Sequence, residues 1–249
     1  EPLDTSSRRS IVIQPAQSEP PLDPEQATAV VRFFYHAGEF WQAVVPLDGV
    51  DQVFGQAFNF SRAKKDKAGE ILLDKQGIPK RSIPVLNHLQ ARFTLKPGRA
   101  IELFPLGAHE HTDPVHRLTD FIYSLEAVGP AGVTFNMRDA LGGNLISAHR
   151  FLSTHEMVFE RIVVENQYVT ETSSLSLDDS HKRQLLVKAL LRSHTAGPMT
   201  EPYYLYRLFR TNNCTSNPFQ MLDTVADYNV APRIGSMLYR FPISPRLYL

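Results

Sequence analysis

The segment RTNNCTSNPFQMLD, residues 210–223, contains the single cysteine of the chain, Cys214, among asparagines and hydroxyl-bearing residues. A free cysteine is usually a small buried hydrophobe, so this polar setting suggests chemistry. An apolar helical pattern follows, with Asn217 as a candidate N-cap and Pro218 in the first turn. A helix N-terminus lowers the pKa of a nearby thiol, and its free N–H groups can hold the oxyanion of a tetrahedral intermediate. The segment predicts a nucleophilic thiol, although an inert loop cysteine explains the same residues.

Acyl transfer by a thiolate also needs a histidine that moves protons and a third group that orients the histidine. Around the thiol, Asn213, Thr215 and Ser216 are the candidates for holding the oxyanion or polarising a substrate carbonyl. An asparagine before a helix is also an ordinary turn or cap residue, so Asn213 has a structural interpretation beside the catalytic one.

A second group of candidate ligands lies in the segment AHEHTDPVH. Its members are His109, His111, Asp113 and His116. The spacing H-x-H-x-D resembles the opening of the metallo-β-lactamase motif, in which two histidines of a short loop bind zinc. Pro114 stands where that motif has a further histidine, so His149 or His155 would have to complete the site. A zinc-dependent hydrolase is therefore an alternative, beside a surface loop that contains histidines by chance.

The composition excludes several classes of function. The chain has 249 residues, of which 43% are hydrophobic, and equal numbers of basic and acidic residues, 26 of each. This suits a globular protein with a large core and gives no indication of nucleic-acid binding. There is no run of about 18 apolar residues, so no transmembrane helix is expected. The first residues contain neither an initiator Met nor an apolar leader, which is typical of a mature end after signal removal or of a shortened chain.

Hydrophobic periodicity predicts an extended N-terminal arm over residues 1–26 and one α+β domain over residues 27–249, with many strands and a few helices. The alternating segment 157–177 predicts a long strand or a bent pair of strands. The residues around His149 and His155 predict a loop, and the charged segment 62–81 predicts a solvated loop or hairpin. Helices are expected over residues 177–194, with Asp178 among the cap candidates, and from near Cys214 through residues 218–228.

The segment YYLYRLFRTNNCTSNPFQMLD, residues 203–223, resembles the signature segment of the Lnb N-terminal periplasmic domain family of bacteria. The segment NHLQARF, which contains His88, is similar to the strand that carries the family's histidine. The segment IYSLEA, which contains Glu126, is similar to the strand that lies between the histidine and the cysteine. The resemblance covers roughly residues 84–228 and is most specific around Cys214.

This family is similar in layout to circularly permuted papain-like enzymes, including NlpC/P60-type amidases. The resemblance implies a mixed or antiparallel sheet packed against a few helices, and a thiol hydrolase or acyltransferase of the cell envelope, in the periplasm. It also implies that Cys214 attacks the acyl carbon, that His88 acts as base and then acid, and that Glu126 orients His88. The implied substrates are a peptide, a peptidoglycan amide or a lipid ester, with no cofactor. Family members transfer acyl groups from lipid to protein beside a membrane region, so a membrane-proximal partner is a further expectation.

The segment VFGQAFNF, residues 53–60, is also similar to a family strand written FGHAF, and in that register Gln56 stands at the histidine position. The site would then be inactive or would use another histidine. We favour His88, because an H-x-x-x-x-F spacing recurs there and the SLEA segment follows it. The alternative is a non-catalytic envelope protein that binds a partner on the same scaffold. The catalytic hypothesis requires an easily ionised sulfur with an imidazole in contact with it.

Overall fold

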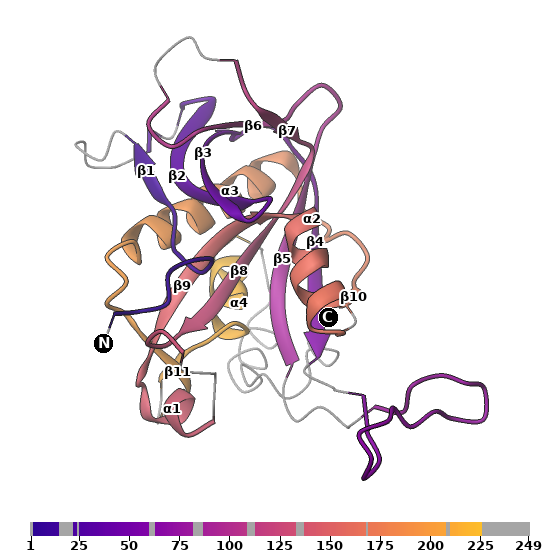
Figure 1. Cartoon of the computed structure of the whole chain (residues 1–249). Helices are drawn as coiled ribbons and strands as arrows, with labels where there is room; N and C mark the ends of the chain where they lie inside the picture. Colours follow the sequence, from indigo (N-terminus) through magenta and orange to yellow (C-terminus); the bar gives the residue numbers. More distant parts are fainter. Residues whose placement is uncertain are drawn as a thin grey trace.

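The computed structural model describes residues 2–14, 22–23, 25–59, 63–81, 87–108, 113–132, 137–167, 169–207 and 210–225. These parts form an α+β fold in which one large sheet carries helices on both faces (Figure 1). The predicted fold class, many strands with a few helices, is confirmed at this level.

Twelve strands of the described parts belong to the sheet. They are β1 (Val12–Gln14), β2 (Thr28–His36), β3 (Glu39–Pro46), β4 (Val50–Asn59), β5 (Asn87–Leu95), β6 (Ile101–Phe104), β7 (His116–Leu118), β8 (Asp120–Val128), β9 (Leu145–Ser153), β10 (Val169–Glu171), β11 (Pro202–Arg207) and β12 (Arg210–Asn212). The helices are α1 (Met137–Gly142), α2 (Thr154–Val158), the π-helix η1 (Phe159–Val164), α3 (Asp179–Thr195) and α4 (Ser216–Asp223).

The strand order is β10-β4-β5-β8-β9-β2-β3-β6-β7, with β1 beside β2, β11 beside β9, and β12 beside β11. All the described pairings are antiparallel except that of β2 with β9. A tight turn at Ala37 and Gly38, both with positive φ, joins β2 to β3. The sheet is thus mostly a set of neighbouring antiparallel strands, as the alternating sequence pattern predicts.

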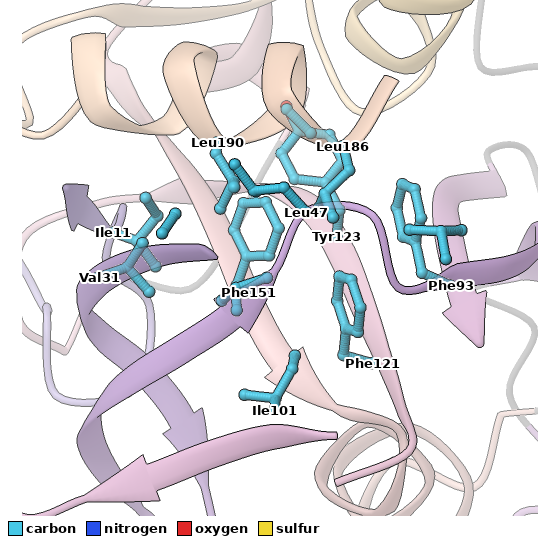
Figure 2. Close-up of a cluster of buried hydrophobic side chains, with 14 of the residues drawn as sticks. Ile11, Val31, Leu47, Phe93, Ile101, Phe121, Tyr123, Phe151, Leu186 and Leu190 are labelled. Atoms are coloured by element: carbon cyan, nitrogen blue, oxygen red, sulfur yellow. The ribbon is translucent and has the colours of Figure 1, made fainter. Parts of the chain in front are cut away.

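Adjacent residues of β8 show how the two faces of the sheet are covered, because successive side chains of a strand point to opposite faces. Tyr123 packs in the main core with Leu186 and Leu190 of α3 (Figure 2). Its neighbour Ile122 packs with Met157 of α2 instead. One face therefore carries α3, and the other carries α2 and η1.

Helix α3 confirms the helix predicted over residues 177–194. The Asp178 side chain accepts a hydrogen bond from the His181 N–H at 2.8 Å and so caps its start. Leu185, Leu186 and Leu190 are buried against the sheet. Each buried leucine contributes roughly 1.5–3 kcal/mol to the free energy of folding. Part of the predicted arm also joins the core, because β1 pairs with β2 and both Ile11 and Ile13 are fully buried.

Two predictions of secondary structure are wrong. The residues around His149 form the central strand β9 rather than a loop, because their polar groups find partners inside the fold: the Tyr123 hydroxyl lies 2.6 Å from His149 Nδ1. The first part of the predicted strand 157–177 is helical. Ser153 caps α2 by accepting the Glu156 N–H at 3.1 Å, and in η1 the buried Arg161, not the apolar residues, faces the sheet. In the described parts, no helix combines the length and apolar character that a membrane crossing requires.

Candidate functional site

Cys214 lies just before α4, and its side chain is buried in the described structure, with the residue 4% exposed. The sulfur contacts the main chain of β5 on both sides of His88: it lies 4.0 Å from the Asn87 carbonyl oxygen and accepts a hydrogen bond from the Leu89 N–H. The Tyr203 hydroxyl donates to it at 3.8 Å. The thiol is therefore held by backbone and hydroxyl groups at the end of β5.

The environment of the sulfur opposes ionisation. Burial raises the pKa of the Cys214 thiol, and the negative charge of Glu126 acts in the same direction. The Leu89 N–H and the Tyr203 hydroxyl lower this pKa, but their effect is smaller than that of burial. The sequence predicted an easily ionised sulfur at a helix start, and the structure gives the opposite direction because the site excludes water.

The amides predicted to hold an oxyanion are already occupied. The side-chain oxygen of Asn213 accepts hydrogen bonds from the N–H groups of Thr215 at 2.9 Å and Ser216 at 2.8 Å. Its side-chain nitrogen donates to the Leu205 carbonyl at 2.8 Å, and its own N–H donates to the Ser216 hydroxyl at 3.0 Å. Asn213 therefore closes the turn before α4, which is the structural interpretation of this residue. The helix begins at Ser216 with Thr215 in the cap position, two residues earlier than the predicted Asn217.

His88 lies in β5 and is buried. Its Nε2 lies 2.7 Å from the Ser124 hydroxyl, which donates to Glu126 Oε1 at 2.9 Å. Because that hydroxyl gives its only proton to the carboxylate, it accepts the hydrogen of His88 Nε2. The neutral ring is thus protonated at Nε2, and it stacks on the ring of Phe58 with centroids 4.4 Å apart.

The structure brings His88 and Glu126 together, with His88 Nε2 and Glu126 Oε1 3.6 Å apart. Burial lowers the pKa of His88 to about 4, although the Glu126 charge opposes this. Burial also opposes ionisation of Glu126, but Arg161, which donates to Glu126 Oε1 at 2.7 Å, and His88 hold its pKa well below the usual range. Glu126 is a carboxylate paired with a buried guanidinium, and Ser124 links it to the imidazole.

The side chains of Cys214 and His88 are not brought together. Leu89 lines a small cavity beside Pro218 and Met221 of α4, and side chains alternate along a strand, so the His88 ring points to the opposite face from α4. No histidine ring in the described parts lies within hydrogen-bonding distance of the sulfur. The backbone of β5 separates the predicted nucleophile from the predicted base.

The alternative register does not supply a base either. Gln56 lies in β4, where its amide nitrogen donates to Glu171 at 2.7 Å and its oxygen accepts from Gln90 at 2.7 Å. Gln56 and Phe58 are two residues apart in one strand, so Gln56 shares the face on which His88 stacks against Phe58. Both candidate histidine positions therefore face away from α4.

Sequence reasoning missed Arg161, which organises the polar layer between the sheet and η1. It donates to Glu126 and to Glu165, and its guanidinium lies 4.4 Å from the centroid of Phe58. The available signal was one arginine inside an otherwise apolar run, FERIVV, which fits a buried charge with a carboxylate partner.

The cavity on the α4 face of β5 is small and apolar, with a volume of about 40 Å³. Its walls come from β4, β5, α3 and α4. A volume of this size holds roughly one to three water molecules. In this conformation the cavity does not accommodate a peptide or an acyl chain.

The predicted zinc site lies partly outside the described residues, because His109 and His111 are not among them. Asp113 is exposed, and the ring of His116 packs against those of His36 and Trp41 with centroids 4.7 Å and 5.0 Å apart. Within the described ranges, no group of three or more candidate ligands is arranged to hold a metal ion.

The two histidines that were candidates to complete the zinc site lie in different elements. His149 is fully buried in β9, and His155 is exposed in α2.

Comparison of the chain with family models, with curated proteins and with solved structures finds no match.

Proposed function

We propose that this chain is a binding protein of the bacterial cell envelope, in which Cys214 stabilises the fold rather than attacking a substrate. The envelope location and the permuted papain-like scaffold come from the sequence resemblance described above. The proposal that Cys214 does not attack a substrate comes from the geometry around the sulfur.

The observation that carries this proposal is the position of the sulfur relative to the groups that thiol catalysis needs. A thiolate must form, a base must lie within hydrogen-bonding reach, and free donors must face the oxyanion. Around Cys214, burial raises the thiol pKa, β5 lies between the sulfur and the His88 ring, and the Asn213 side chain occupies the amides of Thr215 and Ser216.

A thiol hydrolase or acyltransferase acting on a peptide, peptidoglycan amide or lipid ester is the second candidate. Two observations favour it: Glu126 and His88 form a pair at 3.6 Å, and the Tyr203 hydroxyl and the Leu89 amide both donate to the sulfur. Burial raises the pKa of Tyr203 well above its usual range, so the hydroxyl remains a neutral donor. This candidate requires the end of β5 to move so that the imidazole reaches Cys214.

Thiol labelling separates the two candidates. Iodoacetamide should alkylate Cys214 in the folded chain at least roughly tenfold more slowly than in the same chain unfolded in urea, because the buried thiol reacts only when the structure opens. The pH at which folded-state labelling is half-maximal should lie above that of the unfolded chain. In His88→Gln, the alkylation rate of the folded chain and the pH midpoint of labelling should both change little if the protein is not a thiol enzyme. A midpoint below neutral pH that rises in His88→Gln would instead establish a histidine-activated thiolate.

A further inference from the structure

Segment α2–η1 has nearly the reverse of the usual arrangement of a surface helix, because its charged residues Glu156, Glu160 and Arg161 face the protein and all its apolar residues except the buried Met157 face outward. Glu156 is buried and accepts the Gly38 N–H at 3.1 Å. Arg161 is buried against Glu126, and Glu160 binds the fully buried Arg150 at 2.7 Å. The sheet therefore binds the segment mainly through charges, together with the buried Met157, and leaves the outer apolar side without a partner in the described structure.

The exposed side of α2–η1 consists of aliphatic and aromatic residues. Val163 and Val164 are 65% and 64% exposed, and Phe159 is 49% exposed. The exposed apolar residues of the segment are Val158, Phe159, Ile162, Val163 and Val164. Five adjacent apolar side chains facing solvent are unusual in a protein that works alone in water, and such patches mark interaction surfaces.

A second apolar surface lies on the projecting hairpin, residues 63–81 (Figure 1). Its exposed apolar residues are Ile71, Leu72, Leu73 and Ile78. The hairpin also contains six basic and three acidic residues, an excess of three positive charges in a chain whose formal net charge is zero. Two of the acids, Asp66 and Asp74, accept backbone N–H groups of the hairpin turns. Among the described residues, none of the five hairpin lysines forms an ion pair.

The hairpin and η1 are joined at their bases. Arg81, the last described residue of the hairpin, donates to the Asn166 carbonyl at 2.7 Å and to its side-chain oxygen at 3.2 Å. Asn166 follows η1 by two residues, and both segments lie on the right of the molecule in Figure 1. The two apolar surfaces therefore belong to neighbouring parts of the molecule.

We propose that the outer side of α2–η1 and the hairpin 63–81 together form a membrane-contact surface, which binds the headgroup region of an anionic lipid bilayer. The valines of η1 and the aliphatic hairpin residues enter the boundary between headgroups and acyl chains, and the hairpin lysines bind lipid phosphates. The inference deepens the proposed binding function by naming the partner, and it does not depend on the reactivity of Cys214.

The composition of this surface favours lipid over protein. Protein interfaces are enriched in aromatic residues, Met and Arg and depleted in Lys, whereas this surface is mostly Val, Ile and Leu, with Phe159 as its one exposed aromatic residue, beside unpaired lysines. A second copy of the chain is also disfavoured, because a two-fold contact would place the same excess of positive charge on both sides. An anionic bilayer supplies both the apolar phase and the opposite charge.

Vesicle co-sedimentation of the full chain tests the proposal. The chain should sediment with vesicles of phosphatidylcholine and phosphatidylglycerol, more weakly with phosphatidylcholine alone, and less as salt is added. The triple variant K64Q/K65Q/K67Q should bind the anionic vesicles roughly 100-fold more weakly, because each lysine contributes about a fivefold factor. Val163→Asp should also lose binding, whereas Leu141→Asp in the distant helix α1, at a residue 48% exposed, should bind as the parent chain does.

Further measurements distinguish a lipid bilayer from the other possible partners of this surface, which are a second copy of the chain and another part of the same chain. In a Trp41→Phe/Phe159→Trp variant, whose only tryptophan is the introduced one, the emission should shift to shorter wavelength when anionic vesicles are added, which reports entry of this residue into the bilayer. The proposal is overturned if the chain binds neither vesicle, or if light scattering shows a dimer that Val163→Asp dissociates. It is also overturned if Val163→Asp lowers the thermal midpoint well below that of Leu141→Asp, since another part of the chain would then cover the valine.

Discussion

Acidification should destabilise the protein through His88, and the size of the effect follows from its burial. Burial lowers the pKa of His88 from about 6.5 to about 4 in the folded state, whereas the unfolded chain keeps the ordinary value. Between these two pH values the unfolded state binds one more proton than the folded state. The contribution of His88 to stability is therefore fully present above about pH 6.5 and is lost as the pH falls towards 4.

The expected magnitude is large compared with the total stability of a domain. Each pH unit between the two pKa values removes about 1.4 kcal/mol, so His88 alone should remove roughly 3 kcal/mol over the whole interval. A typical domain has about 5–15 kcal/mol of stability, so this loss should be measurable without unfolding the protein. Below about pH 4 both states bind the proton, and His88 should cause no further loss.

Urea unfolding at a series of pH values from 7 to 4 measures this effect in the parent chain and in His88→Gln. Glutamine keeps an N–H donor for the Ser124 hydroxyl but cannot be protonated, so the variant should lose roughly 3 kcal/mol less than the parent over this range. His149, whose pKa is lowered by burial, contributes equally to both chains and cancels in the difference. Parallel stability curves for the two chains would refute the assignment of His88 as a buried neutral imidazole.

Two further predictions concern the turn before α4 and the turn after α1. Asn213→Ala should cost roughly 3 kcal/mol in urea unfolding, because two buried N–H groups and one carbonyl lose their partner, whereas Asn144→Ala, at an exposed residue, should cost less than about 1 kcal/mol. Equal losses would show that Asn213 does not hold the turn. Gly143→Ala should cost at least roughly 2 kcal/mol, because φ is +74° and the new Cβ would lie 2.1 Å from the Tyr204 ring. Gly38→Ala, at φ +79° with open space around it, should cost only about 1 kcal/mol, and a smaller loss at Gly143 than at Gly38 would contradict the close contact.

The parts of the fold that the sequence predicts are those in which local pattern and tertiary contacts agree. In α3, the cap residue Asp178 and the leucine spacing both point to one helix with one buried side. The central strand β9 could not be predicted in this way. Its buried side chains include His149 and Arg150, two polar residues whose types are typical of a loop. They are stable inside the fold because their partners, Tyr123 and Glu160, come from other elements of the structure.

The site was predictable in its location but not in its geometry. The sequence places Cys214 before a helix, and it lies before α4. Whether His88 faces that helix depends on strand register, because a shift of one residue exchanges its direction with that of Leu89. Register is set by the pairing of β5 with β4 and β8, which no motif in the sequence specifies. The exclusion of water that raises the thiol pKa is likewise a property of the assembled core.

The outward direction of the η1 valines follows from the same buried polar layer that holds His88. Turning the segment over would bury five apolar side chains that are now 38–65% exposed, which would gain roughly 4–8 kcal/mol. The same rotation would break two buried ion pairs, Arg161 with Glu126 and Arg150 with Glu160, each at a cost of about 3–5 kcal/mol. Breaking the two ion pairs costs more than burial of the apolar side chains would gain, so the buried polar layer keeps the apolar side of the segment towards solvent. If the buried polar layer keeps the membrane-contact surface exposed, Glu126→Gln should weaken vesicle binding without altering any residue of that surface. Unchanged binding would show that the ion pair of Glu126 with Arg161 does not determine how the surface is presented.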